Sequence, residues 1–96
     1  MTKRIYDSNV VKARLKELRR EKGVTQAEVA KAVHFSVSTI KQYENGYRIP
    51  DSLNLATLAE YYSVQENYIL GLSEHRTKLS ELFATFSREE IAESRM

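Results

Sequence analysis

Apolar residues recur at helical spacing from the start of the chain. The first set stands at positions i, i+4 and i+7, which predicts one buried face of a helix running to about Lys22. That set is Val11, Leu15 and Leu18. Ser8 or Asn9 can cap this helix at its start, and Gly23 can end it.

The next stretch predicts two short helices with a tight corner between them. Thr25 and Glu28 form a capping box, in which the side chain of each residue satisfies the backbone N–H of the other. The inner faces of the two helices are then made of Val29, Ala30 and Val33, and of Ile40 and Tyr43. Ser36 offers an N-cap oxygen for the second helix, and Gly46 supplies the left-handed residue that ends it.

The outer face of the second short helix is almost wholly polar. Its members fall near positions i, i+1, i+4, i+5 and i+8, and they are Val37, Ser38, Lys41, Gln42 and Asn45. A helix with a slim first turn and hydrogen-bonding side chains can enter the major groove of DNA.

Two further helices are predicted after the loop that follows Gly46. Asp51 or Ser52 caps the first of them, whose inner face is Leu55, Leu58, Ala59 and Tyr62. A short helix then runs through Leu70 and is closed by Gly71. The core residues expected from this region are Val64, Tyr68, Ile69 and Leu72.

Several runs of residues carry a family resemblance because of their order and spacing. They are Leu-Lys-Glu-Leu-Arg-Arg-Glu-Lys-Gly-Val-Thr-Gln-Ala-Glu-Val-Ala at 15–30, Ser-Thr-Ile-Lys-Gln-Tyr-Glu-Asn-Gly at 38–46, Pro50, Leu-Ala at 58–59 and Tyr-Ile-Leu-Gly at 68–71. Together they resemble the phage repressor and Cro-type (Xre-type) helix-turn-helix family. The resemblance covers about residues 10–72 and implies an all-α, lambda-repressor-like domain of five helices, in which the third helix reads bases.

The resemblance also implies roles for single residues. It implies that Arg19 pairs with Glu44 and ties the first helix to the third, and that Gln26 bonds the DNA backbone. His34 stands where the family usually has a glycine at a corner that needs positive φ, and we expect a mildly strained backbone there. Gln65 replaces the family's Ser-type cap, so we expect a ragged start to the fifth helix.

The polar outer face suggests how base pairs would be read. Ser38 and Gln42 are the candidates for hydrogen bonds to base edges, and a glutamine amide can make a two-point contact with adenine. Val37 can touch a thymine methyl group, and Lys41 can reach a guanine or a phosphate. The remaining candidates for DNA contact are Ser36, for which capping is favoured over base contact, and Asn45, Tyr47 and Arg48, which follow the reading helix.

Residues 73–96 lie beyond the resemblance and predict one or more additional helices. An amphipathic stripe recurs at i, i+3, i+4 and i+7, made of Leu79, Leu82, Phe83 and Phe86. Ser87 and Glu90 form a further capping box before Ile91. This C-terminal amphipathic extension either packs against the chain's own core or forms a dimer contact, and residues 1–8 are expected to be an N-terminal arm before a DNA-binding domain at 9–72.

Charge and composition narrow the classes of function. The net charge is +2, but residues 1–48 carry eleven Lys and Arg against five Asp and Glu, whereas residues 49–96 carry four against eight. A polyanion is drawn to the first half and repelled by the second. The chain has no Cys, and no apolar run approaches the ~20 residues that span a bilayer, so a cytoplasmic location with no membrane partner is expected.

The residues give little support for catalysis or for a metal site. There is no glycine-rich phosphate loop and no nucleophile set, and His34 and His75 are isolated from one another, so we expect no enzyme activity, no catalytic residue, no cofactor and no metal site.

The function expected is a sequence-specific transcription regulator that binds double-stranded DNA as a homodimer. One such domain covers only a few base pairs, so specific binding needs a second copy on an operator with two-fold symmetry. Repression is the commoner outcome in the resembled family. The alternative is a protein-interaction module, for example an antitoxin-like partner, and a protein partner or co-repressor is compatible with either role.

Overall fold

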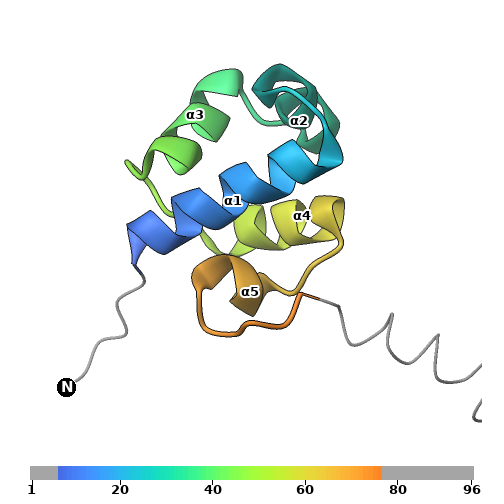
Figure 1. Ribbon diagram of the computed structural model, residues 1–96. Coiled ribbons are helices and arrows are strands. Elements are labelled where there is room, and N and C mark those ends of the chain that lie inside the picture. The colour runs from blue at the N-terminus through green and yellow to red at the C-terminus, as the bar shows by residue number, and fades with distance from the viewer. Residues whose placement is uncertain (1–6, 77–96) are drawn as a thin grey trace, which may run out of the picture.

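Five α-helices follow one another in the part of the chain that the structure describes, residues 7–76 of this computed structural model (Figure 1). They are α1 (Ser8–Lys22), α2 (Gln26–Val33), α3 (Val37–Asn45), α4 (Ser52–Tyr62) and α5 (Glu66–Leu70). The all-α, lambda-repressor-like fold class is therefore confirmed. Most of the predicted N-terminal arm lies outside the described residues, as do the amphipathic stripe of 79–86 and the capping box at 87–90.

The first helix begins one residue earlier than the predicted caps allow. The N-cap is Asp7, whose carboxylate accepts a hydrogen bond from the backbone N–H of Asn9 at 2.9 Å. The choice of Ser8 or Asn9 as the cap was therefore wrong. Asp, Ser and Asn cap helices about equally well, so the local sequence does not distinguish Asp7 from Ser8 or Asn9 as the N-cap.

The other helix ends follow the sequence signals. The capping box of Thr25 and Glu28 is complete, with hydrogen bonds of 2.8 and 3.1 Å. Asp51 is the N-cap of α4, and its carboxylate accepts from the backbone N–H of Asn54 at 2.9 Å. Gly23 and Gly46 both adopt left-handed backbone conformations as C-caps. Because these signals act over three or four residues, they do not depend on the rest of the fold.

Among the described residues, 7–76, two that are not glycine also adopt positive φ. His34 ends α2 with φ 63°, as expected from its place at the corner, and Ser63 ends α4 with φ 57°. Gln65 is the N-cap of α5 and makes no side-chain cap hydrogen bond there; whether the start of α5 is ragged stays a prediction.

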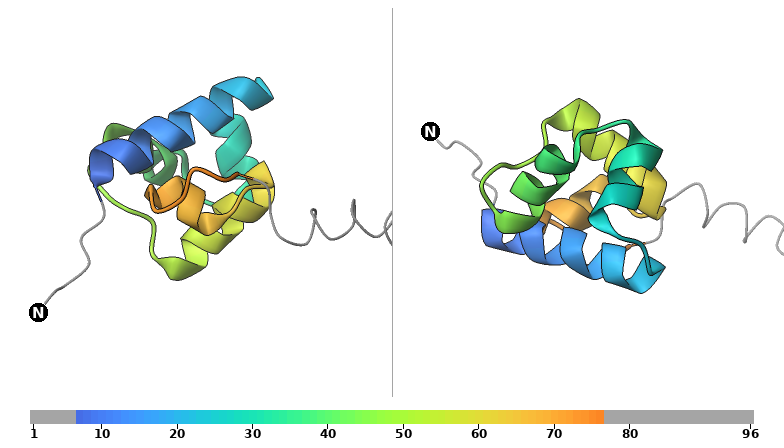
Figure 2. Two further views of the ribbon diagram at one scale, coloured as in Figure 1. Left: turned by 60° about the horizontal axis from the view of Figure 1, so that its bottom comes forward. Right: turned by 90° about the horizontal axis from the view of Figure 1, so that it is seen from above.

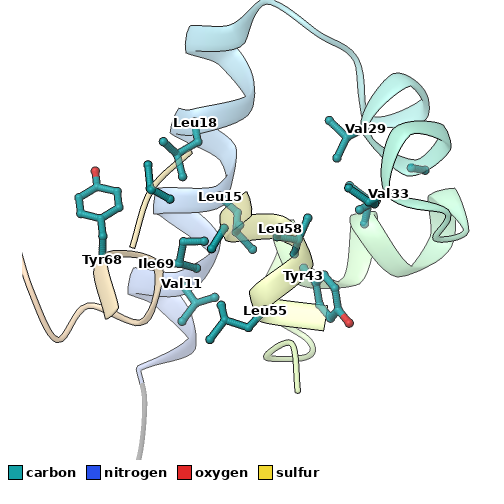
Figure 3. Close-up of a cluster of buried hydrophobic side chains, with 14 residues drawn as sticks. Val11, Leu15, Leu18, Val29, Val33, Tyr43, Leu55, Leu58, Tyr68 and Ile69 are labelled. Carbon is teal, nitrogen blue, oxygen red and sulfur yellow. The ribbon is translucent and has the colours of Figure 1, made fainter. Parts of the chain in front are cut away.

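The core gathers the apolar faces of all five helices (Figure 3). Its members are Val11, Leu15, Leu18, Val29, Ala30, Val33, Ile40, Tyr43, Leu55, Leu58, Ala59, Val64, Tyr68 and Ile69. Leu72 is 46% exposed, so its assignment to the core was wrong. It follows the glycine that ends α5, and helical spacing no longer predicts which side chains are buried there.

The helices are arranged so that α2 and α3 lie together on one side of the molecule. α1 crosses beneath them and packs against both α3 and α5, while α4 lies behind (Figures 1 and 2). None of the helices at 7–76 is long and apolar enough to cross a membrane.

Candidate nucleic-acid interface

Helix α3 is anchored from behind by three buried side chains. Ile40, Tyr43 and Glu44 are each 2% exposed or less. The hydroxyl of Tyr43 accepts a hydrogen bond from Asn54 Nδ2 at 2.9 Å, which joins the back of α3 to α4. The helix is thus fixed on its inner face while its outer face stays available.

The outer face of α3 holds the predicted reading residues in one surface. Ser38, Lys41 and Asn45 are exposed, Val37 is 38% exposed and Gln42 is partly buried. The loop after the helix adds exposed Arg48 and Tyr47, which is 80% exposed. Seen from above, α2 and α3 face the viewer, with α1 along one side (Figure 2).

Ser36 uses its hydroxyl to begin α3. Its Oγ accepts from the backbone N–H of Thr39 at 3.1 Å and lies 2.9 Å from Thr39 Oγ1. These contacts favour the capping role over a base contact, because the hydroxyl already has protein partners.

The carboxylate of Glu44 links three helices from inside the domain. Its oxygens accept from Arg19 Nε at 2.9 and 3.1 Å, and Oε1 also accepts from Gln26 Nε2 at 3.1 Å. Arg19 further donates to the backbone carbonyl of Val24 at 3.0 Å. The hydrogen bond to Glu44 raises the pKa of Arg19. Burial raises the pKa of Tyr62, and the charge of Glu44 raises it further.

The Arg19–Glu44 pair is thus present in the structure, and it has a third member that the sequence did not suggest. Gln26 stands at the start of α2, where a phosphate contact was expected, and one N–H of its amide is directed inward to Glu44. A single amide N–H is used in this bond, so the remaining polar groups of Gln26 stay compatible with a phosphate contact. The residues are 18 positions apart, and no local pattern signals their contact.

Arg48 makes another contact that the sequence did not suggest. Its Nη1 donates to Gln42 Oε1 at 3.2 Å, and its guanidinium lies 5.6 Å from the centre of the Tyr43 ring. Two predicted DNA-contact residues are therefore bonded to each other at the end of α3.

A second polar cluster lies on the α5 side of α1. The guanidinium groups of Arg14 and Arg76 lie 4.2 and 5.0 Å from the centre of the Tyr68 ring. Arg76 also bonds Glu21 at 2.8 Å, and this hydrogen bond raises the pKa of Arg76 and lowers that of Glu21. Arg14 donates to the carbonyl oxygens of Tyr68 and Ser73, so the cluster holds residues 73–76 against α1.

Within residues 7–76, no three His, Cys, Asp or Glu side chains gather in a way that could hold a metal ion. The surface formed by α2, α3 and the following loop combines exposed polar side chains with a rigid support, and this combination makes it the candidate binding site.

Comparison with known proteins agrees with this geometry. A family model described as helix-turn-helix matches residues 15–69. Over 61 residues the chain is 39% identical to the HTH-type transcriptional regulator ImmR of Bacillus subtilis (strain 168). The matched region is 64% of this chain and 48% of that protein. Over 88 residues it is 34% identical to the HTH-type transcriptional regulator PrpR of Mycobacterium tuberculosis (strain ATCC 25618 / H37Rv), covering 90% of this chain and 18% of that protein.

The chain thus spans about half the length of one curated relative and less than a fifth of the other. No solved structure matched the chain.

Proposed function

The chain belongs to the helix-turn-helix family of DNA-binding transcriptional regulators, and we propose that it reads operator DNA in the major groove with α3. The observation that carries this proposal is the two-sided character of α3, which is buried and bonded behind and polar and exposed in front. An α-helix with its side chains is about 10–12 Å across, which fits the ~12 Å width of the major groove.

The reading residues divide into two groups by their reach. Ser38, Gln42 and Val37 lie on the outer face of α3 and are proposed to contact base edges. Lys41 is proposed to reach a guanine or a phosphate, and Asn45 and Tyr47 a phosphate. Gln26 is proposed to contact a phosphate from the start of α2, while its bond to Glu44 holds its amide in place. Phosphate contacts set register and affinity, and base contacts set sequence choice.

A homodimer is proposed because one such helix covers few base pairs. Two copies related by a two-fold axis would read half-sites about 34–36 Å apart, one turn of DNA. A regulator bound in this way can block a promoter, and repression is the outcome we propose.

Selection from random duplex DNA tests the class and the symmetry together. The expected result is an enriched inverted repeat whose half-sites are centred about 10 base pairs apart. Enrichment of a single half-site would contradict the homodimer, and no enrichment at all would contradict sequence-specific reading. In that last case a protein partner would have to be sought for the same surface.

The Lys41→Ala variant separates phosphate contact from base contact at that position. If Lys41 meets a phosphate, binding weakens on every sequence and the slope of log K against log salt falls by about 1. An unchanged slope with altered preference at one base pair would assign Lys41 to a guanine instead. Titration at four salt concentrations with the selected operator and a scrambled duplex provides the measurement.

A further inference from the structure

Arg48 lies against Gln42 because the chain turns back after α3. Gly46 has φ 81°, and the backbone N–H groups of Tyr47 and Arg48 both donate to the carbonyl of Gln42, at 3.0 and 3.3 Å. This turn carries residue 48 back over the last turn of the helix. Nη1 of Arg48 then donates to Gln42 Oε1 at 3.2 Å, so a backbone and a side-chain hydrogen bond both connect Arg48 to Gln42.

The guanidinium of Arg48 is supported from a second direction. It lies 5.6 Å from the centre of the Tyr43 ring, within the range of a cation–π contact. The ring is 1% exposed, and its hydroxyl is bonded to Asn54, so it cannot shift freely. Arg48 therefore rests on a rigid platform when it meets the Gln42 amide.

This contact determines the orientation of the amide. A guanidinium carries only donors, so the atom of Gln42 that it bonds must be the oxygen. The nitrogen of the same amide then points away from Arg48. Base pairs in the major groove are distinguished by their order of donors and acceptors, and a flipped amide presents the opposite order.

We propose that Arg48 is a positioning residue for sequence reading, which holds the Gln42 amide in one orientation before DNA is bound. The inference rests on the proposed function, since it assumes that Gln42 faces the groove. The remaining N–H donors of Arg48 stay available to a phosphate, so the same side chain can contact the DNA backbone and orient the amide that contacts a base. An amide fixed in advance loses less rotational freedom on binding and rejects the wrong base pair more sharply.

The proposal is tested first by measuring binding to DNA duplexes that differ only at the base pair read by Gln42. The parent, Arg48→Ala, Arg48→Lys, Gln42→Ala and the double variant are titrated with the selected operator and with duplexes that carry each other base pair at the Gln42 position. A good amide contact gives the parent a preference of roughly 5- to 150-fold there. Arg48→Ala is expected to lose most of this preference, at the same base pair that Gln42→Ala affects. The double variant is expected to be no less selective than Gln42→Ala alone.

The Arg48→Lys variant separates orientation from charge. Lysine keeps the positive charge but lacks the planar fork. The salt dependence is expected to match the parent, while the preference at the Gln42 position falls. Arg20→Ala, on the outer face of α1, serves as a control that leaves the preference unchanged. If Arg48→Ala weakened binding to every duplex by the same factor, Arg48 would be a phosphate contact only and the proposal would be overturned.

A measurement without DNA keeps the inference separate from the proposed function. The ¹⁵N relaxation of the Gln42 side-chain amide is recorded in the free protein, with Tyr47→Ala as a control in the same loop. The amide is expected to become more mobile in Arg48→Ala and to stay ordered in the control. Equal mobility in the parent and in Arg48→Ala would overturn the inference. A parent with an ordered amide but no sequence preference would overturn the proposed function and leave the positioning contact standing.

Discussion

Removing Arg19 tests the buried link that holds helix α3. Glu44 is 2% exposed, and it accepts two hydrogen bonds from Arg19 and one from Gln26. Arg19→Met keeps most of the side-chain volume but leaves a buried carboxylate with Gln26 alone. Breaking a buried ion pair in this way costs about 3–5 kcal/mol. Because the side chain of Arg19 is 18% exposed and water can enter, we take about 3 kcal/mol as the expected cost.

That cost is large enough to measure without ambiguity. For a domain of this size, 1 kcal/mol lowers Tm by about 4–8 °C, so the variant is expected to melt about 12–24 °C below the parent. Urea unfolding at pH 7, followed by circular dichroism, gives the free energy directly. Arg20→Met is the matched control on the exposed face of α1, and it should stay within about 0.5 kcal/mol of the parent.

A double variant distinguishes the charge from the packing. Arg19→Met with Glu44→Leu removes the unpaired carboxylate as well, and replacing both members of a buried pair by apolar residues is often close to neutral. The double variant should therefore be more stable than Arg19→Met alone. The reasoning is refuted if Arg19→Met costs less than about 1 kcal/mol, or if the added Glu44→Leu lowers stability further.

The remaining predictions concern the glycine caps and acid stability. Gly71→Ala should destabilise more than Gly23→Ala. Both residues have positive φ, which alone costs about 1–2 kcal/mol for a residue with a side chain. A methyl group at position 71 would also lie 2.7 Å from Val10 Cγ1, whereas a methyl group at position 23 would have no atom within 4 Å. Equal urea midpoints for the two variants would contradict this prediction. The bond from Arg76 lowers the pKa of Glu21 from its ordinary value of 4.5, so this carboxylate stabilises the fold above that pH, and its contribution disappears as the pH falls through the folded-state pKa. Glu21→Gln should flatten the stability profile in that acid window, and superimposable profiles would argue against the pairing.

The sequence by itself determined the local features of this protein. The capping box at Thr25, the glycine ends of α1 and α3, and the apolar stripe of α1 each depend on residues three or four positions apart. Such signals act within one or two turns of helix, and the fold confirms them. The resemblance in residues 10–72 added the order of the five helices and the expectation that the third helix reads bases.

Tertiary structure decided what joins these helices and how the candidate site is held. Gln26 meets Glu44 across 18 positions, and Arg14 meets the carbonyl of Tyr68 across 54. Neither contact follows from spacing, because both depend on the angle at which helices pack. The same cause explains the two errors at helix ends, since several polar residues could cap α1 and only the packed fold shows that Leu72 stays exposed. The bond between Arg48 and Gln42 is of this kind as well, because it depends on the turn at Gly46 and on the buried ring of Tyr43, near which the guanidinium lies.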